Sequence, residues 1–80
     1  MNRWILDKLE SLITSGNIEA AIRELEKVEF QFELPSQRRY WAALKASLVT
    51  AETLEGYRRQ YFMEIAINSI KRLKQWTFSQ

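Results

Sequence analysis

The chain of 80 residues contains no cysteine and no histidine, and its only aspartate is Asp7. These absences exclude disulfides, thiol nucleophiles, the usual zinc sites and the side chain best suited to proton transfer near neutral pH. Hydrolytic or acid–base chemistry would have to use serine–lysine or carboxylate pairs. Because Glu52, Glu55 and Glu64 occupy positions typical of a helix surface, we expect no enzyme activity, no cofactor and no metal site.

Long hydrophobic runs are also missing. No apolar run approaches the roughly twenty residues that cross a bilayer, and charge interrupts the first eight residues too early for a signal peptide. Small secreted domains often depend on disulfides, so the lack of cysteine favours a cytoplasmic protein. We therefore expect no membrane partner.

Glycine and proline are scarce, with two and one respectively, while 46% of the residues are hydrophobic. This composition is typical of a folded domain and not of a disordered chain. A chain of this length supports one core, so we interpret residues 1–80 as a single helical interaction domain. The starting methionine and the absence of catalytic chemistry lead us to expect the N-terminal module of a longer protein.

Hydrophobic periodicity predicts an all-α fold, a compact four-helix bundle. The expected helices cover residues 3–14, 18–28, 37–49 and 53–76, and an extended connector of alternating apolar and polar residues covers 29–35.

Several residues are predicted to set the helix ends. Gly16 has the conformational freedom to close the first helix, and Asn17 is a good cap for the second. Ser36 is expected to cap the third helix, and Thr50 or Thr53 the fourth.

Apolar side chains at helical spacing are predicted to form the shared core. The expected stripes are Ile5, Leu9, Leu12 and Ile13; Ile18, Ala21, Ile22, Leu25 and Val28; Tyr40, Trp41, Leu44 and Leu48; and Tyr61, Phe62, Ile65, Ala66, Ser69, Ile70, Leu73 and Trp76. Met63 and Ile67 widen the last stripe. Gly56 lowers helix propensity, so the fourth helix is expected to fray or to begin near Tyr57.

Residues 16–28, which read GNIEAAIRELEKV, resemble the inter-helix turn and second helix of a tetratricopeptide unit. An array of such units needs neighbours, since each unit exposes an apolar face that only stacking covers. No second copy occurs, because the segment after Gly56 lacks the alanine and the matching spacing. Residues 36–80 therefore argue against an array.

Over nearly the whole chain, the order of features is similar to the eleventh type of bacterial effector-associated domain. The residues that carry this resemblance are the turn Leu12-Ile13-Thr14-Ser15-Gly16, the pair Ala21-Ile22, the segment at 40–45, the turn at 50–57 with its tyrosine, and the aliphatic Ile65 and Ile70. Where the family has an asparagine in its last helix, this chain has Phe62 and Met63. The resemblance implies a small death-domain-like adaptor that recruits effectors through identical or paired domains.

Charge is unevenly distributed along the chain. Residues 1–34 carry four basic and seven acidic side chains, and residues 35–80 carry eight basic and three acidic ones. The candidate basic face comprises Arg38, Arg39, Arg58, Arg59, Lys71 and Lys74, and the candidate acidic face comprises Asp7, Glu10, Glu19, Glu24 and Glu26. Such faces favour head-to-tail association by steering, although charge runs often only solvate a helix.

Aromatic side chains supply further candidates. Trp4 lies outside the apolar stripe of the first helix and is a candidate exposed anchor, as are Phe30 and Phe32 of the connector, while Trp41 and Trp76 are expected to pack at the core. The sequence thus predicts a protein–protein interaction adaptor whose partner is an identical or cognate helical domain, with a homo-oligomer as one form of assembly. The alternatives are a tetratricopeptide-like scaffold for a partner peptide and, less favoured, a small nucleic-acid-binding domain.

Overall fold

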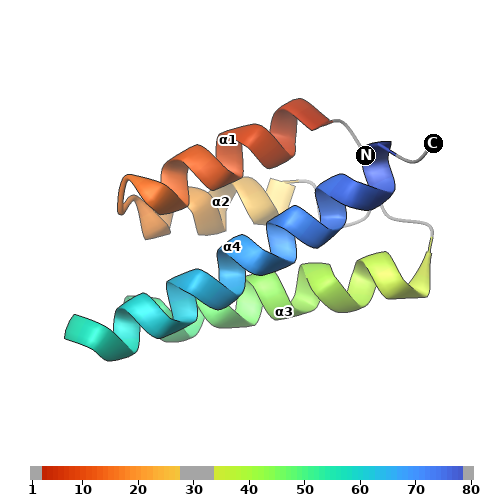
Figure 1. Cartoon of the computed structure of the whole chain (residues 1–80). Coiled ribbons are helices and arrows are strands. Elements are labelled where there is room, and N and C mark those ends of the chain that lie inside the picture. The colour runs from red at the N-terminus through yellow and green to blue at the C-terminus, as the bar shows by residue number, and fades with distance from the viewer. Residues whose placement is uncertain (1–2, 28–33, 79–80) are drawn as a thin grey trace.

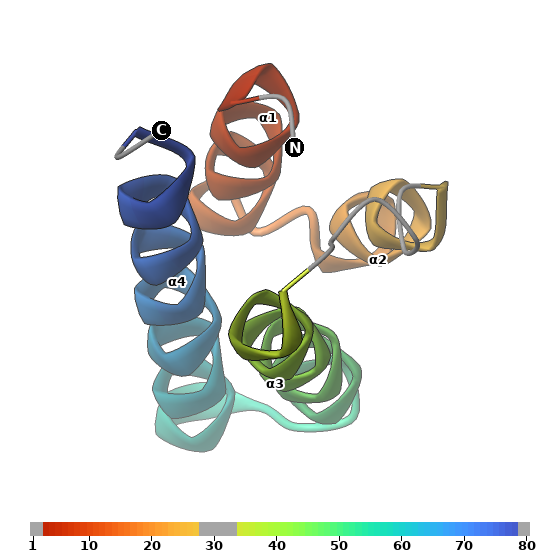
Figure 2. The same cartoon turned by 90° about the vertical axis from the view of Figure 1, so that its right-hand side faces the viewer.

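Four α-helices make up the computed structural model, which describes residues 3–27 and 34–78 (Figure 1). They are α1 (Arg3–Thr14), α2 (Ile18–Lys27), α3 (Pro35–Glu52) and α4 (Gly56–Phe78). Helix α1 contacts α2 and α4, and α3 contacts the same two helices. The described residues therefore form the predicted all-α four-helix bundle, in which each helix has two neighbours around one core (Figure 2).

The turn between α1 and α2 has the predicted glycine closure. Gly16 adopts a φ of 86°, in the left-handed region that glycine enters without steric cost. Its N–H donates to the carbonyl of Ile13 at 3.1 Å, and the Asn17 N–H donates to the carbonyl of Leu12 at 2.8 Å. This pair of bonds is a Schellman motif, and it ends α1 at Thr14 as predicted.

Helix α3 begins earlier than predicted. Leu34, and not Ser36, is its N-cap, with an extended φ of −89° and ψ of 138°. Pro35 follows as the first helical residue, where a missing N–H costs nothing because that group has no partner within the helix. The Gln37 side chain accepts a hydrogen bond from the Leu34 N–H at 3.4 Å. Residues 28–33, which include most of the predicted connector, lie outside the described residues.

The boundary between α3 and α4 differs from the predicted ranges, which end α3 at 49 and start α4 at 53, but it agrees with the alternative start near Tyr57. Helix α3 continues to Glu52, and Thr53 is its C-cap, with the Thr53 hydroxyl donating to the Thr50 carbonyl at 2.8 Å. Both threonines therefore serve the end of α3, and neither caps α4. Helix α4 begins at Gly56, which has a φ of 64°. Glycine adopts this left-handed conformation without steric cost, so it suits the turn in which the chain reverses direction.

The core is built from all four helices. Its buried apolar side chains are Leu6, Leu9, Ile13, Ile18, Ala21, Leu25, Trp41, Leu44, Leu48, Ala51, Met63, Ala66, Ile70 and Leu73. Burying one large aliphatic side chain contributes about 1.5–3 kcal/mol to the stability of the folded state. This core therefore fixes the four helices relative to one another. Among the helices of residues 3–27 and 34–78, none combines the length and the apolar character that a bilayer-spanning helix requires.

Two side chains depart from the predicted stripes. Leu6, which is not part of the predicted stripe of α1, is fully buried, whereas Tyr61, a member of the predicted core, is 60% exposed. The reason for the second difference is helical geometry, because Tyr61 is two residues, or about 200°, away from the buried Met63. Tyr40 is half-buried, and the side chain of Trp76 and residue Val28 lie outside the described residues.

Candidate partner-binding surface

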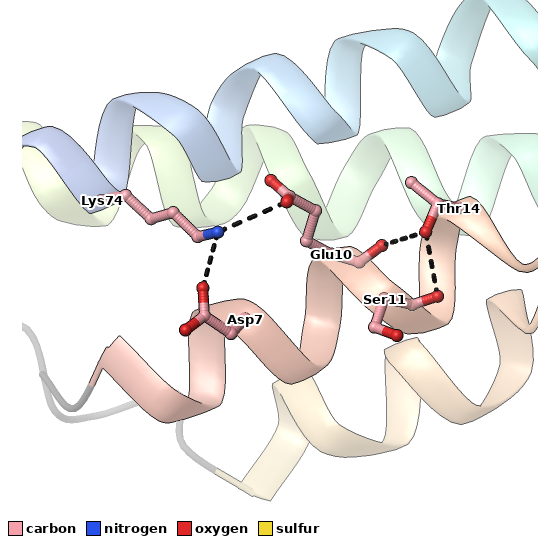
Figure 3. A network of polar contacts seen from close by, with 5 residues as sticks. All are labelled: Asp7, Glu10, Ser11, Thr14 and Lys74. Atoms are coloured by element: carbon pink, nitrogen blue, oxygen red, sulfur yellow. Dashed lines mark hydrogen bonds and ion pairs between the residues drawn. The ribbon is translucent and has the colours of Figure 1, made fainter.

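Lys74 of α4 joins two carboxylates of α1 (Figure 3). Its Nζ lies 2.7 Å from Oδ1 of Asp7 and 3.4 Å from Oε1 of Glu10, and its side chain is only 17% exposed. Burial lowers the pKa of Lys74, but the hydrogen bond with Asp7 and the negative charges of Glu10 and Asp7 outweigh that effect, so the pKa is raised. Lys74, predicted for the basic partner face, is thus bonded within the molecule.

The end of α1 beside this site is held by local hydrogen bonds. The Thr14 hydroxyl donates to the Glu10 carbonyl at 2.9 Å and to the Ser11 carbonyl at 3.1 Å (Figure 3). These bonds use backbone acceptors of the last turn, so they stabilise the helix that presents Glu10.

A second charge cluster joins α1 to α2. Oε1 of Glu24 lies 3.3 Å from the Lys8 Nζ and 3.4 Å from the Lys27 Nζ. The hydrogen bond with Lys8 lowers the pKa of Glu24 most, and the bond and charge of Lys27 add to this against the opposing effect of desolvation. Glu19 forms a longer, exposed pair with Arg23 at 4.0 Å.

The predicted acidic face is therefore largely neutralised within the molecule. Asp7, Glu10, Glu19 and Glu24 all have cationic neighbours. Glu26 is exposed and has no ion pair within residues 3–27 and 34–78. The carboxylates of α1 and α2 would have to exchange these partners before pairing with another protein.

Most basic residues of the predicted partner face, unlike most of the acidic ones, form no ion pair within the described residues. Within the described ranges no ion pair is formed by Arg39, Arg58, Arg59, Lys71 or Arg72. Of the rest of the predicted basic face, Arg38 lines a hollow on α3. Arg59 lines another hollow with Glu52, beside the α1–α2 turn. These five cations without an ion pair all lie on α3 and α4, and the carboxylates without an ion pair in the same ranges are Glu26, Glu52, Glu55 and Glu64.

A groove between α3 and α4 brings several of these features together, and we call it the basic groove. It has a volume of about 630 Å³ and is lined by Tyr40, Ala43, Ile65, Asn68, Ser69, Lys71, Arg72 and Gln75. Arg39 lies one turn before Ala43, on the same side of α3. The Ser69 hydroxyl donates to the Ile65 carbonyl at 3.0 Å, so it is already bonded within α4.

Exposed aromatic side chains lie on α4 and at the start of α1. Tyr57 is 80% exposed and Tyr61 is 60% exposed. The Tyr61 and Phe62 rings pack edge to face, with their centroids 5.3 Å apart. Tyr61 is one turn before Ile65 of the basic groove, so the two share a side of α4. Sequence reasoning missed both tyrosines as surface candidates, although their helical phase relative to Met63 and Ile70 contains that information.

The predicted aromatic anchors have different outcomes. Trp4 is 63% exposed, as expected of an anchor, and the Lys8 Nζ lies over its ring at 5.4 Å from the centroid. Phe30 and Phe32 lie outside the described residues. Arg72, which is not one of the six residues of the predicted basic face, lines the basic groove beside Lys71.

The hollow that Arg38 lines is separate from the basic groove. It has a volume of about 610 Å³ and is lined by Arg38, Trp41, Ala42, Lys45, Ala46, Val49 and Thr50. All of these residues belong to α3.

Within the described ranges, no group of three or more acidic side chains is placed to hold a metal ion. Comparisons with protein-family models, with curated proteins and with solved structures find no match for this chain. The candidate functional surface is the basic groove with its lining cations, together with the exposed Tyr57 and Tyr61 that precede it on α4.

Proposed function

We propose that this chain is a protein–protein interaction adaptor, which recruits or assembles effector or sensor proteins through an identical or related helical domain. The observation that carries this proposal is the exposure of Tyr57 and Tyr61 on α4, next to cations without partners in the described residues. Large aromatic side chains and arginine are the residues that most often dominate protein interfaces. Exposing them favours association, because burial at an interface removes apolar surface from water.

The resemblance of the sequence to effector-associated domains supplies the biological setting of the proposal, a bacterial conflict or signalling system. The packing is compatible with such a module. All four helices bury their apolar sides in one core, so the domain does not need stacked repeats to cover α1 and α2. A tetratricopeptide-like array, the alternative, would need that stacking.

Site-directed photo-crosslinking tests the proposal. A photoreactive phenylalanine analogue is placed at Tyr57 or Tyr61, with exposed Ser11 on α1 as the matched control position. We expect both tyrosine positions to yield the same crosslinked product, joined either to a second copy of this chain or to a small helical domain of another protein. The Ser11 position should yield much less of it.

Self-association is measured separately by sedimentation velocity over a range of concentrations and salt. A mass that rises with concentration and falls after Tyr57→Ala or Tyr61→Ala would support homotypic assembly. A monomer at all concentrations, together with equal crosslinking at Tyr57, Tyr61 and Ser11, would contradict the adaptor proposal.

A further inference from the structure

We infer that the basic groove binds an acidic peptide segment of the partner protein, with carboxylates beside Lys71 and Arg72 and an apolar side chain against Ile65. This inference rests on the proposed adaptor function and adds the chemistry of the partner. It identifies α3 and α4, and not the acidic helices, as the binding side of the bundle.

The first argument is the availability of charge around the groove. Lys71 and Arg72 line it and Arg39 lies one turn before Ala43, and none of the three forms an ion pair in the described residues. Lys74, only three residues after Lys71, already bonds Asp7 and Glu10. The cations of the groove can therefore pair with a partner without first breaking an internal ion pair, which lowers the cost of association.

The sign of the local charge gives the second argument. No carboxylate lines the groove, and Glu64 is the only acidic residue of α4, against five arginines and lysines on the same helix. Because opposite charges attract and like charges at an interface are costly, this side of the molecule favours an acidic partner and disfavours a basic one.

The lining of the groove explains why the ligand is also partly apolar. Ala43 and the half-buried Ile65 lie between the two helices, and the exposed Tyr61 lies one turn before Ile65. Burying an apolar side chain there would add favourable transfer energy to the charge contacts. Asn68, which also lines the groove, has both a donor and an acceptor for peptide groups.

Helix geometry sets the spacing of the ligand. Ile65 and Arg72 are seven residues apart on α4, which corresponds to about 10.5 Å along the axis. An extended peptide would cover this distance with about three residues, and a helical one with about seven. The partner segment should therefore carry its apolar side chain about 10 Å from its carboxylates.

Titration of the isotopically labelled full chain with a synthetic peptide tests the inference. The probe is a peptide of about ten residues with one leucine three positions before a pair of glutamates. We expect chemical-shift changes at the amides of Asn68, Lys71 and Arg72. Replacing the glutamates of the probe by lysines should abolish them, and replacing its leucine by alanine should weaken binding.

Matched variants separate the groove from general electrostatics. Lys71→Ala should weaken binding of the probe about fivefold. Arg23→Ala, which removes one exposed cation on α2, should have little effect. Circular dichroism of both variants checks that the helices are retained. An equal loss in the two variants, or no shifts in the groove, would overturn the inference.

Two further outcomes distinguish this inference from its alternatives. Tighter binding of a thymidine oligonucleotide than of the peptide, with shifts at the same residues, would mean a nucleic-acid site and would refute the peptide assignment. Crosslinking at Tyr57 and Tyr61 that persists in a Lys71→Ala, Arg72→Ala variant would refute the groove alone and leave the adaptor proposal standing. Loss of crosslinking only in that variant would support the groove.

Discussion

Replacing Lys74 by methionine would measure how much the ion pairs between α1 and α4 stabilise the bundle. Methionine keeps most of the length and apolar character of the lysine stem and removes its charge. The variant loses the contacts of Nζ with Asp7 at 2.7 Å and with Glu10 at 3.4 Å. Lys71→Met is the matched control, because Lys71 is exposed and forms no ion pair in the described residues.

The expected magnitude follows from the exposure of the three side chains. Lys74 is 17% exposed, Glu10 32% and Asp7 50%, so water screens the pairs only in part. Exposed pairs contribute about 0.2–1 kcal/mol, and breaking a buried one costs about 3–5 kcal/mol. We therefore expect Lys74→Met to lower the free energy of unfolding by about 1–2 kcal/mol, and Lys71→Met by less than about 0.5 kcal/mol.

Urea denaturation followed by far-UV circular dichroism measures this difference. The effect of Lys74→Met should shrink in about 1 M salt, where the Debye length falls to about 3 Å. Because the pKa of Lys74 is raised on folding, its stabilisation is complete below the ordinary lysine value of about 10.4 and is lost as the pH rises through the raised value. Equal stability of Lys74→Met and the parent chain, or an equal loss in Lys71→Met, would refute the reasoning.

Three further predictions concern the fold. Gly16→Ala should lower the free energy of unfolding by about 1–2 kcal/mol, because Gly16 has a φ of 86° that strains a residue with a Cβ. No atom lies within 4 Å of the added methyl group, so backbone strain is the only cost. Gly16→Asn should cost less in the same denaturation assay. Leu44→Ala should cost about 2–5 kcal/mol by leaving a cavity, whereas Val49→Ala, 45% exposed, should cost under about 1 kcal/mol; similar losses would contradict the core assignment. The stabilising contribution of Glu24, whose pKa is lowered chiefly by the hydrogen bond with Lys8, is present above the ordinary glutamate value of about 4.3 and is lost as the pH falls through the lowered one. Glu24→Gln should therefore flatten the acid side of a plot of melting temperature against pH, and an unchanged slope would disprove this.

The sequence predicted those parts of the fold that local interactions determine. Helix α1 ends where Gly16 allows a left-handed turn, and glycine is the residue most suited to that conformation. The start of α3 was displaced because Ser36 is a good cap by type, while Pro35 fits the first helical position without loss. Thr53 was ambiguous for the same reason, since its hydroxyl can serve the end of one helix or the start of the next.

The candidate surface was harder to predict, because ion pairing depends on how helices pack. Lys71 and Lys74 look alike in the sequence, three residues apart on one helix. Only the packing of α1 against α4 brings Asp7 and Glu10 to Lys74 and leaves Lys71 at the basic groove. The prediction for Tyr61 is wrong because tyrosine suits both a core and a surface, and its helical phase differs from that of the buried Met63.

The antiparallel pairing of α1 and α4 has a consequence for tethering. Helix α1 begins and α4 ends at the same extremity of the bundle, and the first turn of α4, with Tyr57, lies at the other (Figure 1). A protein fused before Arg3 or after Phe78 would be attached at one end of the bundle. Along α4, that end lies about 30 Å from Tyr57. Fluorescent or enzymatic tags can thus be attached at either terminus without crowding that tyrosine.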